Sequence, residues 1–561
     1  MNLLKDPWLP FRTRGGSIAY RSPSAISDPN IVDLALPRAD FQGAAYQFLI
    51  GLLQTVYPPQ DYGEWVDRSI EPPGGEALDE AFVPFAQAFE FQGDGPRFMQ
   101  DLDPLADAKP VSVAKLLIDS PSVNGLEKNK DHFVKRGRVV AICEDCAALA
   151  LFTMQVNGPF DGRGTRVGLR GGGPLTTLIV PDQAGASLWQ RLWLNVMPIE
   201  AFSAKAPIRD RCPDDDTLFP WVGATRASGK NGNEVLPEQM HPMYAYWAMP
   251  RRIRLEVGDD EGCCDLCGRK VLQRVSEIRT KSYGAKYDGP WQHPLTPYRR
   301  NPQKPNELPL STKGRADGLG YRHWSNLVLS DEEGSGALPA GVMHDYFSHK
   351  VDFVAQELRA GEDIDALLKP RLWIFGYDMD QAKLRGWCSE ELPLVVVPAE
   401  QQARLRTWVQ TFIELARQTA ETTRKQVKNA WFSRHADAKG DLTSVDSQFY
   451  EATQAAFFRA LRDMQLALQQ GEGPHMPSQV ARAWYHALRK EALTLFEAQA
   501  LNGPFSELDM KRVTRARRQL LSWLSGRSNS KGSKIVSQFA KDGGFTLTEA
   551  QGNAPTEEAV P

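Results

Sequence analysis

Two Cys-x-x-Cys motifs constrain this chain more than any other feature: Cys143 with Cys146, and Cys264 with Cys267. Paired thiols at this spacing are typical of tetrahedral zinc sites, in which thiolate bonds of about 2.3 Å leave no open position for chemistry. More than a hundred residues separate the motifs, far more than in a compact zinc ribbon. We therefore predict a structural Zn²⁺ ion that joins two distant parts of one domain. The alternative is a set of unligated thiols.

Length and composition narrow the class of protein. The chain has 561 residues, of which 42% are hydrophobic, so we expect a large core and no global disorder. A net charge of −3 gives no overall basic signature, so any contact with nucleic acid must come from local patches. No apolar run approaches the roughly 20 residues that cross a bilayer, and MNLLKDPWLPF is not a signal-peptide pattern. We expect a cytoplasmic location, where thiols stay reduced.

Hydrophobic periodicity predicts an α+β fold in two domains and a tail. Residues 1–392 mix helices, such as 41–57 and 76–91, with strands, such as 175–180, 253–257 and the PRLWIFGYDMD segment at 370–380. Residues 393–527 predict a four-helix bundle, because four amphipathic segments follow one another without a strand signal. The four segments are 400–428, 445–470, 478–500 and 506–524. The polar tail, 528–561, predicts disorder.

Residues 157–173 form a basic, glycine-rich segment directly after the first cysteine pair. The segment holds seven glycines and three arginines, Arg163, Arg166 and Arg170. Glycine lets backbone amides approach a ligand closely, and arginine adds fixed positive charge and donor forks that suit phosphates and base edges. The segment is therefore a candidate nucleic-acid contact. Plain turns are the alternative.

Three further segments combine basic residues in a way that suits nucleic acid. Phe133 stands among five cations between residues 121 and 140, and an aromatic among cations can grip single-stranded RNA. Residues 268–304 interleave nine cations with Tyr283, Tyr287, Trp291 and Tyr298. The last helix of the expected bundle carries Lys511, Arg512, Arg515, Arg517 and Arg518, dense enough for a phosphate-facing surface. Solvated loops and faces are the alternative in the first two segments.

The ordered set of motifs resembles the CasA family, the large subunit of the type I-E CRISPR surveillance complex, Cascade. The motifs that carry this resemblance are MNLLKDPWLP, CEDCAALALF, GLRGGGPLTT, WQHPLTP and FGYDMDQA, followed by the four-helix bundle. The resemblance covers the chain to about residue 525. It implies a protein that recognises the protospacer-adjacent motif (PAM) of target DNA.

The resemblance also implies DNA-binding residues. A glycine loop at Gly162, Arg163 and Gly164 would read the PAM from the minor groove, although Arg163 stands where a glycine is expected. Gln381 would be a wedge that starts strand separation. Asp380 and Ala382 flank it. A lysine finger is expected between residues 279 and 286, and Lys281 is our choice over Arg279 and Lys286. The minor groove has a degenerate pattern that such thin elements suit.

The remaining implications concern RNA, metal and partners. Phe133 matches the aromatic residue that contacts the 5′ handle of the guide RNA, and the four cysteines match the zinc site of the family. The expected partners are double-stranded target DNA, guide RNA, the other Cascade subunits, and a helicase–nuclease recruited after the R-loop forms. We therefore predict a non-catalytic DNA-recognition subunit in antiviral defence that opens DNA beside the PAM.

Two other functions compete with this interpretation. The first is a metal-dependent nuclease or hydrolase that acts on nucleic acid, with Asp378 and Asp380 as its best motif and His293 or His323 as added ligands. Its spacing fits no metal-ligand signature, and paired acidic turn residues are more often caps or turn formers. The second is a free RNA-binding scaffold, but the chain has no RRM or KH signature.

Overall fold

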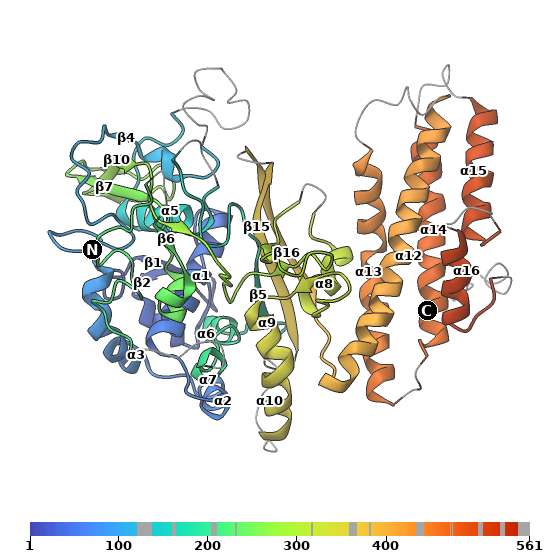
Figure 1. The fold of residues 1–561 in the computed structure, drawn as a ribbon, viewed down its shortest axis with the longest axis horizontal. Helices are drawn as coiled ribbons and strands as arrows, with labels where there is room; N and C mark the ends of the chain where they lie inside the picture. The colour runs from blue at the N-terminus through green and yellow to red at the C-terminus, as the bar shows by residue number, and fades with distance from the viewer. Residues whose placement is uncertain are drawn as a thin grey trace. The chain divides into compact units, whose positions relative to one another are not determined.

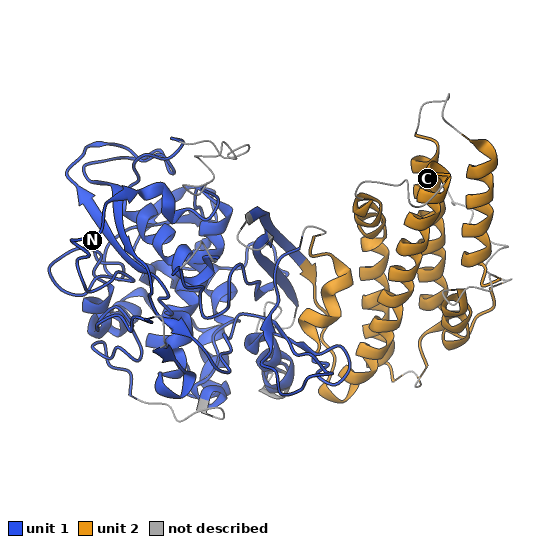
Figure 2. Ribbon diagram, turned by 45° about the horizontal axis from the view of Figure 1, so that its top comes forward, with its two compact units in different colours: residues 1–316, 330–391 blue, residues 317–329, 392–561 orange. Residues whose placement is uncertain are grey.

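The computed structural model describes residues 1–120, 137–159, 164–203, 210–229, 233–315, 318–357, 367, 369–380, 383–433, 442–471, 473, 475–502, 509–527 and 533–547. The chain divides into two compact units (Figure 2). Unit 1 consists of Met1–Ala316 and Ser330–Glu391, and unit 2 consists of Asp317–Leu329 and Leu392–Pro561. The chain therefore leaves unit 1 for a short segment of unit 2, returns, and enters unit 2 again.

Helix α1, Ala39–Val56, lies inside unit 1 (Figure 1). Sixteen of its residues are buried, and they include the polar residues Asp40, Gln47 and Gln54, so nearly the whole surface of the helix lies in the core. The Phe48 ring makes edge-to-face contacts with five other aromatic rings, at centroid distances of 5.6 to 6.2 Å. These rings belong to Trp8, Phe89, Phe98, Phe152 and Trp247. One aromatic cluster thus joins segments from the first 250 residues into a single core.

Shorter helices make up the rest of the helical structure of unit 1. They are α2 (Tyr62–Ile70), α3 (Gly75–Phe82), α5 (Glu144–Asn157), α6 (Leu188–Trp193), α7 (Ile199–Ser203), α9 (Gly341–Asp345) and α10 (Val351–Glu357), with the π-helix η7 (Tyr346–Lys350). The 3-10 turns of unit 1 are η1 (Pro23–Ser27), η2 (Val83–Phe89), η3 (Val113–Leu116), η4 (Pro237–Gln239) and η5 (Pro242–Tyr246). The helix expected over 76–91 is split between α3 and η2, because Pro84 has no N–H to continue the α-helical pattern.

Three sheets of three strands position the candidate site and the N-terminus. The strand orders are β2 (Ile18–Arg21), β1 (Leu9–Thr13), β3 (Ile31–Leu34); then β4 (Val111–Ser112), β10 (Arg274–Lys281), β7 (Arg252–Gly258); and β16 (Lys383–Pro393), β15 (Pro370–Asp380), β5 (Thr176–Pro181). In the last sheet, antiparallel pairing places Pro370 opposite Pro181 and Phe375 opposite Thr176. This pairing connects segments almost two hundred residues apart in the sequence.

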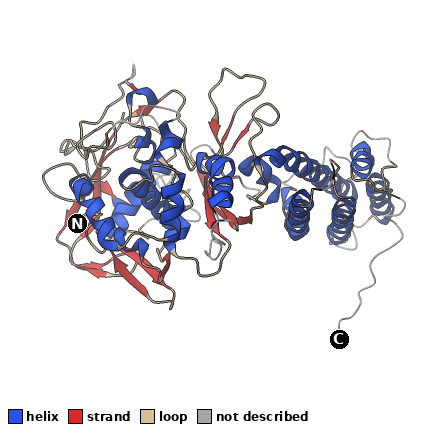
Figure 3. Ribbon diagram, turned by 90° about the horizontal axis from the view of Figure 1, so that it is seen from below, coloured by secondary structure: helices blue, strands red, loops and turns tan. Residues whose placement is uncertain are grey.

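Short strands complete unit 1. They are β11 (Lys286–Tyr287) paired with β6 (Glu234–Val235), β8 (Gly262–Cys263) paired with β9 (Lys270–Val271), and the order β13 (Leu310–Ser311), β12 (Tyr298–Arg299), β14 (Ala337–Leu338). The mixture of helices and strands confirms the expected α+β class for this part of the chain (Figure 3).

Unit 2 contains the expected helical bundle, formed by α12 (Ala399–Trp431), α13 (Thr443–Gln469), α14 (Ser478–Ala500) and α15 (Met510–Leu524). The rings of Phe412 and Trp484 stack at 5.7 Å in its core. The segment that precedes Ser330 contributes the turn η6 (Tyr321–His323) and helix α8 (Trp324–Val328). The Tyr321 ring stacks on Phe457 at 4.4 Å, and its hydroxyl lies 2.8 Å from the Thr453 hydroxyl.

The expectation of a disordered tail is wrong for residues 533–547. Helix α16, Ser533–Asp542, places Phe539 edge-on against Phe412 at 5.3 Å, and Phe545 lies 5.8 Å from Tyr485. Val536, Phe539 and Phe545 are buried, so the segment buries enough apolar surface to hold it on the bundle. Residues 548–561 lie outside the described residues. Among the residues that the structure describes, no helix combines the length and apolarity that a membrane span needs.

Candidate nucleic-acid interface and metal centre

Two different local structures supply the four cysteines. Cys143 is the N-cap of α5, and its sulfur accepts a hydrogen bond at 3.5 Å from the backbone N–H of Cys146 in the first turn. Cys264 and Cys267 lie in the turn between β8 and β9, where the Gly268 N–H donates to the Cys264 carbonyl at 2.9 Å. Gly268 has a φ of +75°, which glycine adopts without strain. A helix start and a tight hairpin thus present two sulfurs each.

The four sulfurs form one cluster. All lie within 4.8 Å of one another, and the Cys143 and Cys267 sulfurs are 3.7 Å apart. A tetrahedral centre with bonds of about 2.3 Å has edges of about 3.8 Å, so the cluster fits such a metal ion. Cys263 is exposed and does not belong to the group. The prediction that these four cysteines come together is confirmed, and they could hold a metal ion.

Hydrogen bonding among the thiols polarises this cluster. Bonding with the Cys143 sulfur raises the pKa of Cys146 and lowers the pKa of Cys267 to about 7. A metal ion would replace the protons that the sulfurs share, since thiolates and not thiols are metal ligands. Beside the cluster, burial raises the pKa of Asp145 to about 6, and Arg269 pairs with this carboxylate.

The described end of the expected glycine loop packs against the end of β10. Gly162 and Arg163 lie outside the described residues. Gly164 has a φ of +86°, and a side chain there would place its Cβ 2.7 Å from the Cβ of Ser282. The Gly164 carbonyl accepts a 2.8 Å hydrogen bond from the Tyr283 N–H. Gly164 thus packs against Ser282, the residue that follows Lys281.

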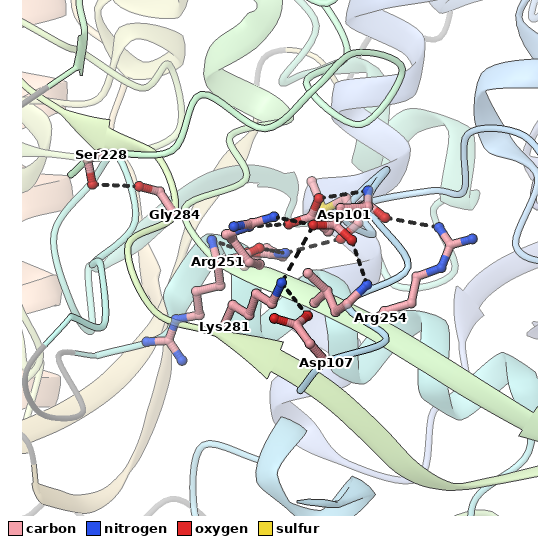
Figure 4. Close-up of polar contacts among 12 residues, drawn as sticks. Asp101, Asp107, Ser228, Arg251, Arg254, Lys281 and Gly284 are labelled. Atoms are coloured by element: carbon pink, nitrogen blue, oxygen red, sulfur yellow. Dashed lines mark hydrogen bonds and ion pairs between the residues drawn. The ribbon is translucent and has the colours of Figure 1, made fainter. Parts of the chain in front are cut away.

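Tyr283 carries backbone strain at this contact. Its φ of +64° is unusual for a residue with a bulky side chain, and such conformations gather at functional sites. The Arg166 guanidinium lies 5.6 Å from the centroid of the Tyr283 ring and donates to the Ser228 hydroxyl at 2.7 Å. Ser228 in turn donates to the Gly284 carbonyl at 2.7 Å (Figure 4). These contacts fix the loop that follows β10.

Lys281, the expected finger, is paired with an acidic loop (Figure 4). Its ammonium lies 2.5 Å from an Asp107 oxygen and 3.7 Å from an Asp103 oxygen, and 27% of its side chain is exposed. The hydrogen bond to Asp107 raises the pKa of Lys281, so the side chain is charged at neutral pH. Sequence reasoning missed these aspartates, because no local pattern joins residues 103–107 to β10.

The two alternative fingers differ in their surroundings. Arg279 pairs with Glu256 and donates to the carbonyls of Ala106 and Ala108, so it holds the acidic loop in place. Lys286 pairs with Glu234 across the short parallel strands β11 and β6. Lys281 is one residue from the contact with Gly164, which favours it as the residue that acts together with the glycine loop.

The other end of the glycine-rich segment packs against β15. Gly173 has a φ of +63°, and a Cβ there would lie 2.5 Å from the Met379 Cγ. One residue before Met379, Asp378 accepts two hydrogen bonds from Arg385 of β16, at 2.9 and 2.6 Å. β15 ends at Asp380 and β16 begins at Lys383; Gln381, Ala382 and the Asp380 side chain lie outside the described positions.

Several residues expected at a nucleic-acid surface belong to the core. Arg170 is 2% exposed and donates to side chains of Gln47, Asn157, Thr176 and Thr296; burial lowers its pKa to about 10. Its role is to satisfy buried oxygens.

Three of the interleaved aromatics also face inward. Tyr298 is buried and lies at hydrogen-bond distance, 2.8 Å, from the His293 N–H. Tyr287 accepts from the Met249 N–H at 2.8 Å, and Trp291 donates to the Val235 carbonyl at 3.0 Å. Only Tyr283 of this set remains beside a cation at the candidate interface. Phe133, in contrast, lies outside the described residues.

The geometry does not favour a metal-dependent hydrolase. Asp378 is committed to Arg385, and His293 is buried, accepts from the Leu295 N–H at its Nδ1 atom, and has a pKa lowered by burial. Within the described ranges, the four cysteines are the one group placed to hold a metal ion. Four thiolates leave no open position on a metal ion for a substrate.

Solved structures of CRISPR-associated proteins have this fold. The chain is 17% identical to Thermus thermophilus CasA (Cse1), with a TM-score of 0.65 over 93% of this chain and 99% of that chain. It is 16% identical to Cse1 from Acidimicrobium ferrooxidans, with a TM-score of 0.65 and coverage of 96% and 99%. A chain of a CRISPR RNA-guided surveillance complex matches at 15% identity, TM-score 0.64, and coverage of 93% and 99%. The fold is therefore that of a large CRISPR-associated protein.

The family follows from the sequence match. A family model described as CRISPR-associated protein Cse1 matches residues 2–495. The chain belongs to the Cse1 family. The prediction that the chain resembles CasA, the large subunit of type I-E Cascade, is thereby confirmed.

Proposed function

We propose that this Cse1 family member is the subunit that recognises the PAM of target DNA in an RNA-guided complex. The observation that carries the proposal is the position of the glycine-rich segment. Gly164 packs beside Ser282, next to Lys281, and Gly173 packs beside Met379, close to Gln381 in sequence. One segment therefore links the glycine loop to the loop after β10 and to the end of β15.

Each element has a physical task in this proposal. The backbone of Gly162, Arg163 and Gly164 enters the minor groove, and Lys281 adds a cation beside it. The groove distinguishes mainly A·T from G·C, so close backbone approach and a thin side chain suit it. Gln381, flanked by Asp380 and Ala382, inserts beside the PAM. Unstacking costs a few kcal/mol per step, which protein contacts and guide pairing then offset.

The metal in this proposal is a structural zinc ion on the four cysteines. Their sulfur donor set and tetrahedral spacing suit zinc. The ion would join the start of α5 to the hairpin that precedes β10, and so fix the strand that carries Lys281. We propose no catalytic role for the ion or for the chain.

The proposed partners follow the family. A match to a chain of a CRISPR RNA-guided surveillance complex supports assembly with other subunits and RNA. We assign the 5′ handle of the guide RNA to Phe133, and we propose that a helicase–nuclease is recruited once the R-loop has formed. We also propose that the complex acts in the cytoplasm.

The wedge assignment is tested with Gln381→Ala in the assembled complex. We expect normal assembly but slower opening of a fully paired target with a correct PAM, because no side chain then separates the first base pair beside the PAM. DNA that is mismatched across the target should restore binding. The measurement is R-loop formation on paired and bubbled duplexes, with Gln303→Ala, an exposed glutamine of the same unit, as the control. Opening at the wild-type rate by Gln381→Ala would show that the wedge assignment is wrong.

The acidic loop gives a second test, through Lys281. Lys281→Gln should weaken binding of the PAM duplex and lower the salt slope by about one, because one cation fewer then displaces counterions from the DNA. Asp107→Asn should strengthen binding several-fold, because Asp107 competes with DNA for the ammonium. In the double variant the Asp107 effect should vanish, since the two residues act as a pair.

Binding isotherms at several salt concentrations measure these effects. Lys286→Gln is the control, because Lys286, like Lys281, is partly exposed and paired with a carboxylate. If Lys286→Gln weakens binding and Lys281→Gln does not, then Lys286 is the finger.

A further inference from the structure

Helix α15 carries three cations on one face. Lys511, Arg515 and Arg518 follow one another at i, i+4 and i+7, so their side chains lie above one another along the helix. All three are exposed, and with Gln519 and Ser522 they line an open groove of about 520 Å³. The helix rises about 1.5 Å per residue, so the cations extend over about 10 Å of its length.

The neighbouring arginines of α15 have other tasks. Arg512 donates to the Ala430 carbonyl at 2.8 Å, and Arg517 pairs with Glu497 at 2.7 Å. Within the part of unit 2 that the structure describes, no carboxylate pairs with Lys511, Arg515 or Arg518. Of the five basic residues that the sequence showed, these three are the ones without an acidic partner among the described residues.

The lining of the groove indicates the class of ligand. All five lining residues are cationic or polar. Stable protein interfaces have an apolar core with few charges, whereas surfaces that bind nucleic acid are more polar and much more positive. Arginine forks bind phosphate oxygens in pairs, lysine adds a point charge, and amide and hydroxyl groups donate single hydrogen bonds.

We propose that this face of α15 binds the sugar–phosphate backbone of nucleic acid without reading its sequence. The site goes beyond the proposed PAM interface, because it belongs to unit 2 and contains no element that reaches base edges. Its contribution to affinity is electrostatic, so it should fall steeply with salt.

The test removes two of the free cations from the full-length chain. Arg515→Gln/Arg518→Gln is compared with Arg417→Gln/Arg517→Gln, which removes two exposed arginines of unit 2 that already pair with glutamates. Both variants change the net charge equally. The probes are a labelled duplex of scrambled sequence without a PAM and the corresponding single strand. Thermal unfolding verifies that both variants are folded.

We expect the first variant to lose affinity for the duplex about tenfold at low salt. The slope of log K against log salt should fall by about 1.8, which is 0.9 for each of two phosphate contacts. The control variant should keep the wild-type slope. Equal losses in both variants would overturn the proposal, because net charge alone would then explain them.

Two further outcomes distinguish this site from its alternatives. If the first variant keeps the wild-type slope but fails to enter the assembled complex, the face binds an acidic protein surface and the proposal is wrong. The preference for a correct PAM over a scrambled one should be unchanged in the first variant. If the PAM proposal fails, Gln381→Ala opens a paired target at the wild-type rate. The decrease in salt slope of the Arg515→Gln/Arg518→Gln variant is then still observed.

Discussion

Cys264→Ser is expected to remove the metal from this protein and to destabilise unit 1 by several kcal/mol. Serine cannot replace a thiolate in the cluster, and binding of a structural zinc ion is coupled to folding. The remaining cysteines lie on α5 and on the β8–β9 hairpin, which the ion would no longer join. Metal content by elemental analysis and thermal unfolding measure the two effects. The wild-type chain should hold about one equivalent of zinc.

Cys263→Ser is the matched control for this experiment. Cys263 is the adjacent residue, but it is exposed and lies outside the cluster. Its replacement should leave the zinc content and the unfolding temperature close to those of the wild type. A wild-type chain purified without chelators that holds less than about half an equivalent would contradict the closed four-thiolate site. Equal destabilisation by Cys263→Ser would also contradict it.

Gly164→Val is expected to reduce binding of the PAM duplex at least tenfold. Valine is strained at a φ of +86°, and its Cβ would lie 2.7 Å from the Ser282 Cβ. The glycine loop or the loop after β10 must therefore move, and Lys281 moves with the latter. A tenfold loss corresponds to about 1.4 kcal/mol, which is within the cost of one strained residue.

The comparison for Gly164→Val is Gly95→Val. Gly95 has no positive φ and no atom within 4 Å of an added Cβ, so valine fits there. Both variants are assembled into the complex and titrated with paired and bubbled target DNA. The bubbled target should rescue Gly164→Val less than Gln381→Ala, because the glycine loop acts before strand opening. Wild-type affinity in Gly164→Val would exclude close approach of this residue to the groove.

Local sequence patterns predicted much of this fold. The helix expected at 478–500 coincides with α14, and the other three bundle helices begin and end within a few residues of their predicted ranges. Helical periodicity is a local property, so these predictions needed no knowledge of partners. Each Cys-x-x-Cys motif is also a local pattern, and the two motifs together identified all four members of the cysteine cluster.

Long-range pairing was beyond such patterns. Nothing near Thr176 in the sequence indicates that it pairs with Phe375, and nothing near Lys281 indicates Asp107. Arg170 shows the same limit, because the local sequence around a basic residue is the same whether its side chain faces solvent or buried oxygens. The structure decides these cases through burial and distance, which depend on the whole unit.

The excursion of the chain through residues 317–329 has a practical consequence for dividing this protein. A fragment that starts at Leu392 would contain all the bundle helices but lack Tyr321 and Trp324. The Thr453 hydroxyl and the face of Phe457 would then lose the tyrosine, and the Pro393 carbonyl would lose the indole N–H that lies 2.8 Å away. A cut at one point of the sequence therefore cannot separate the units intact. A self-sufficient bundle needs the short segment supplied as well, as a linked extension or as a separate peptide.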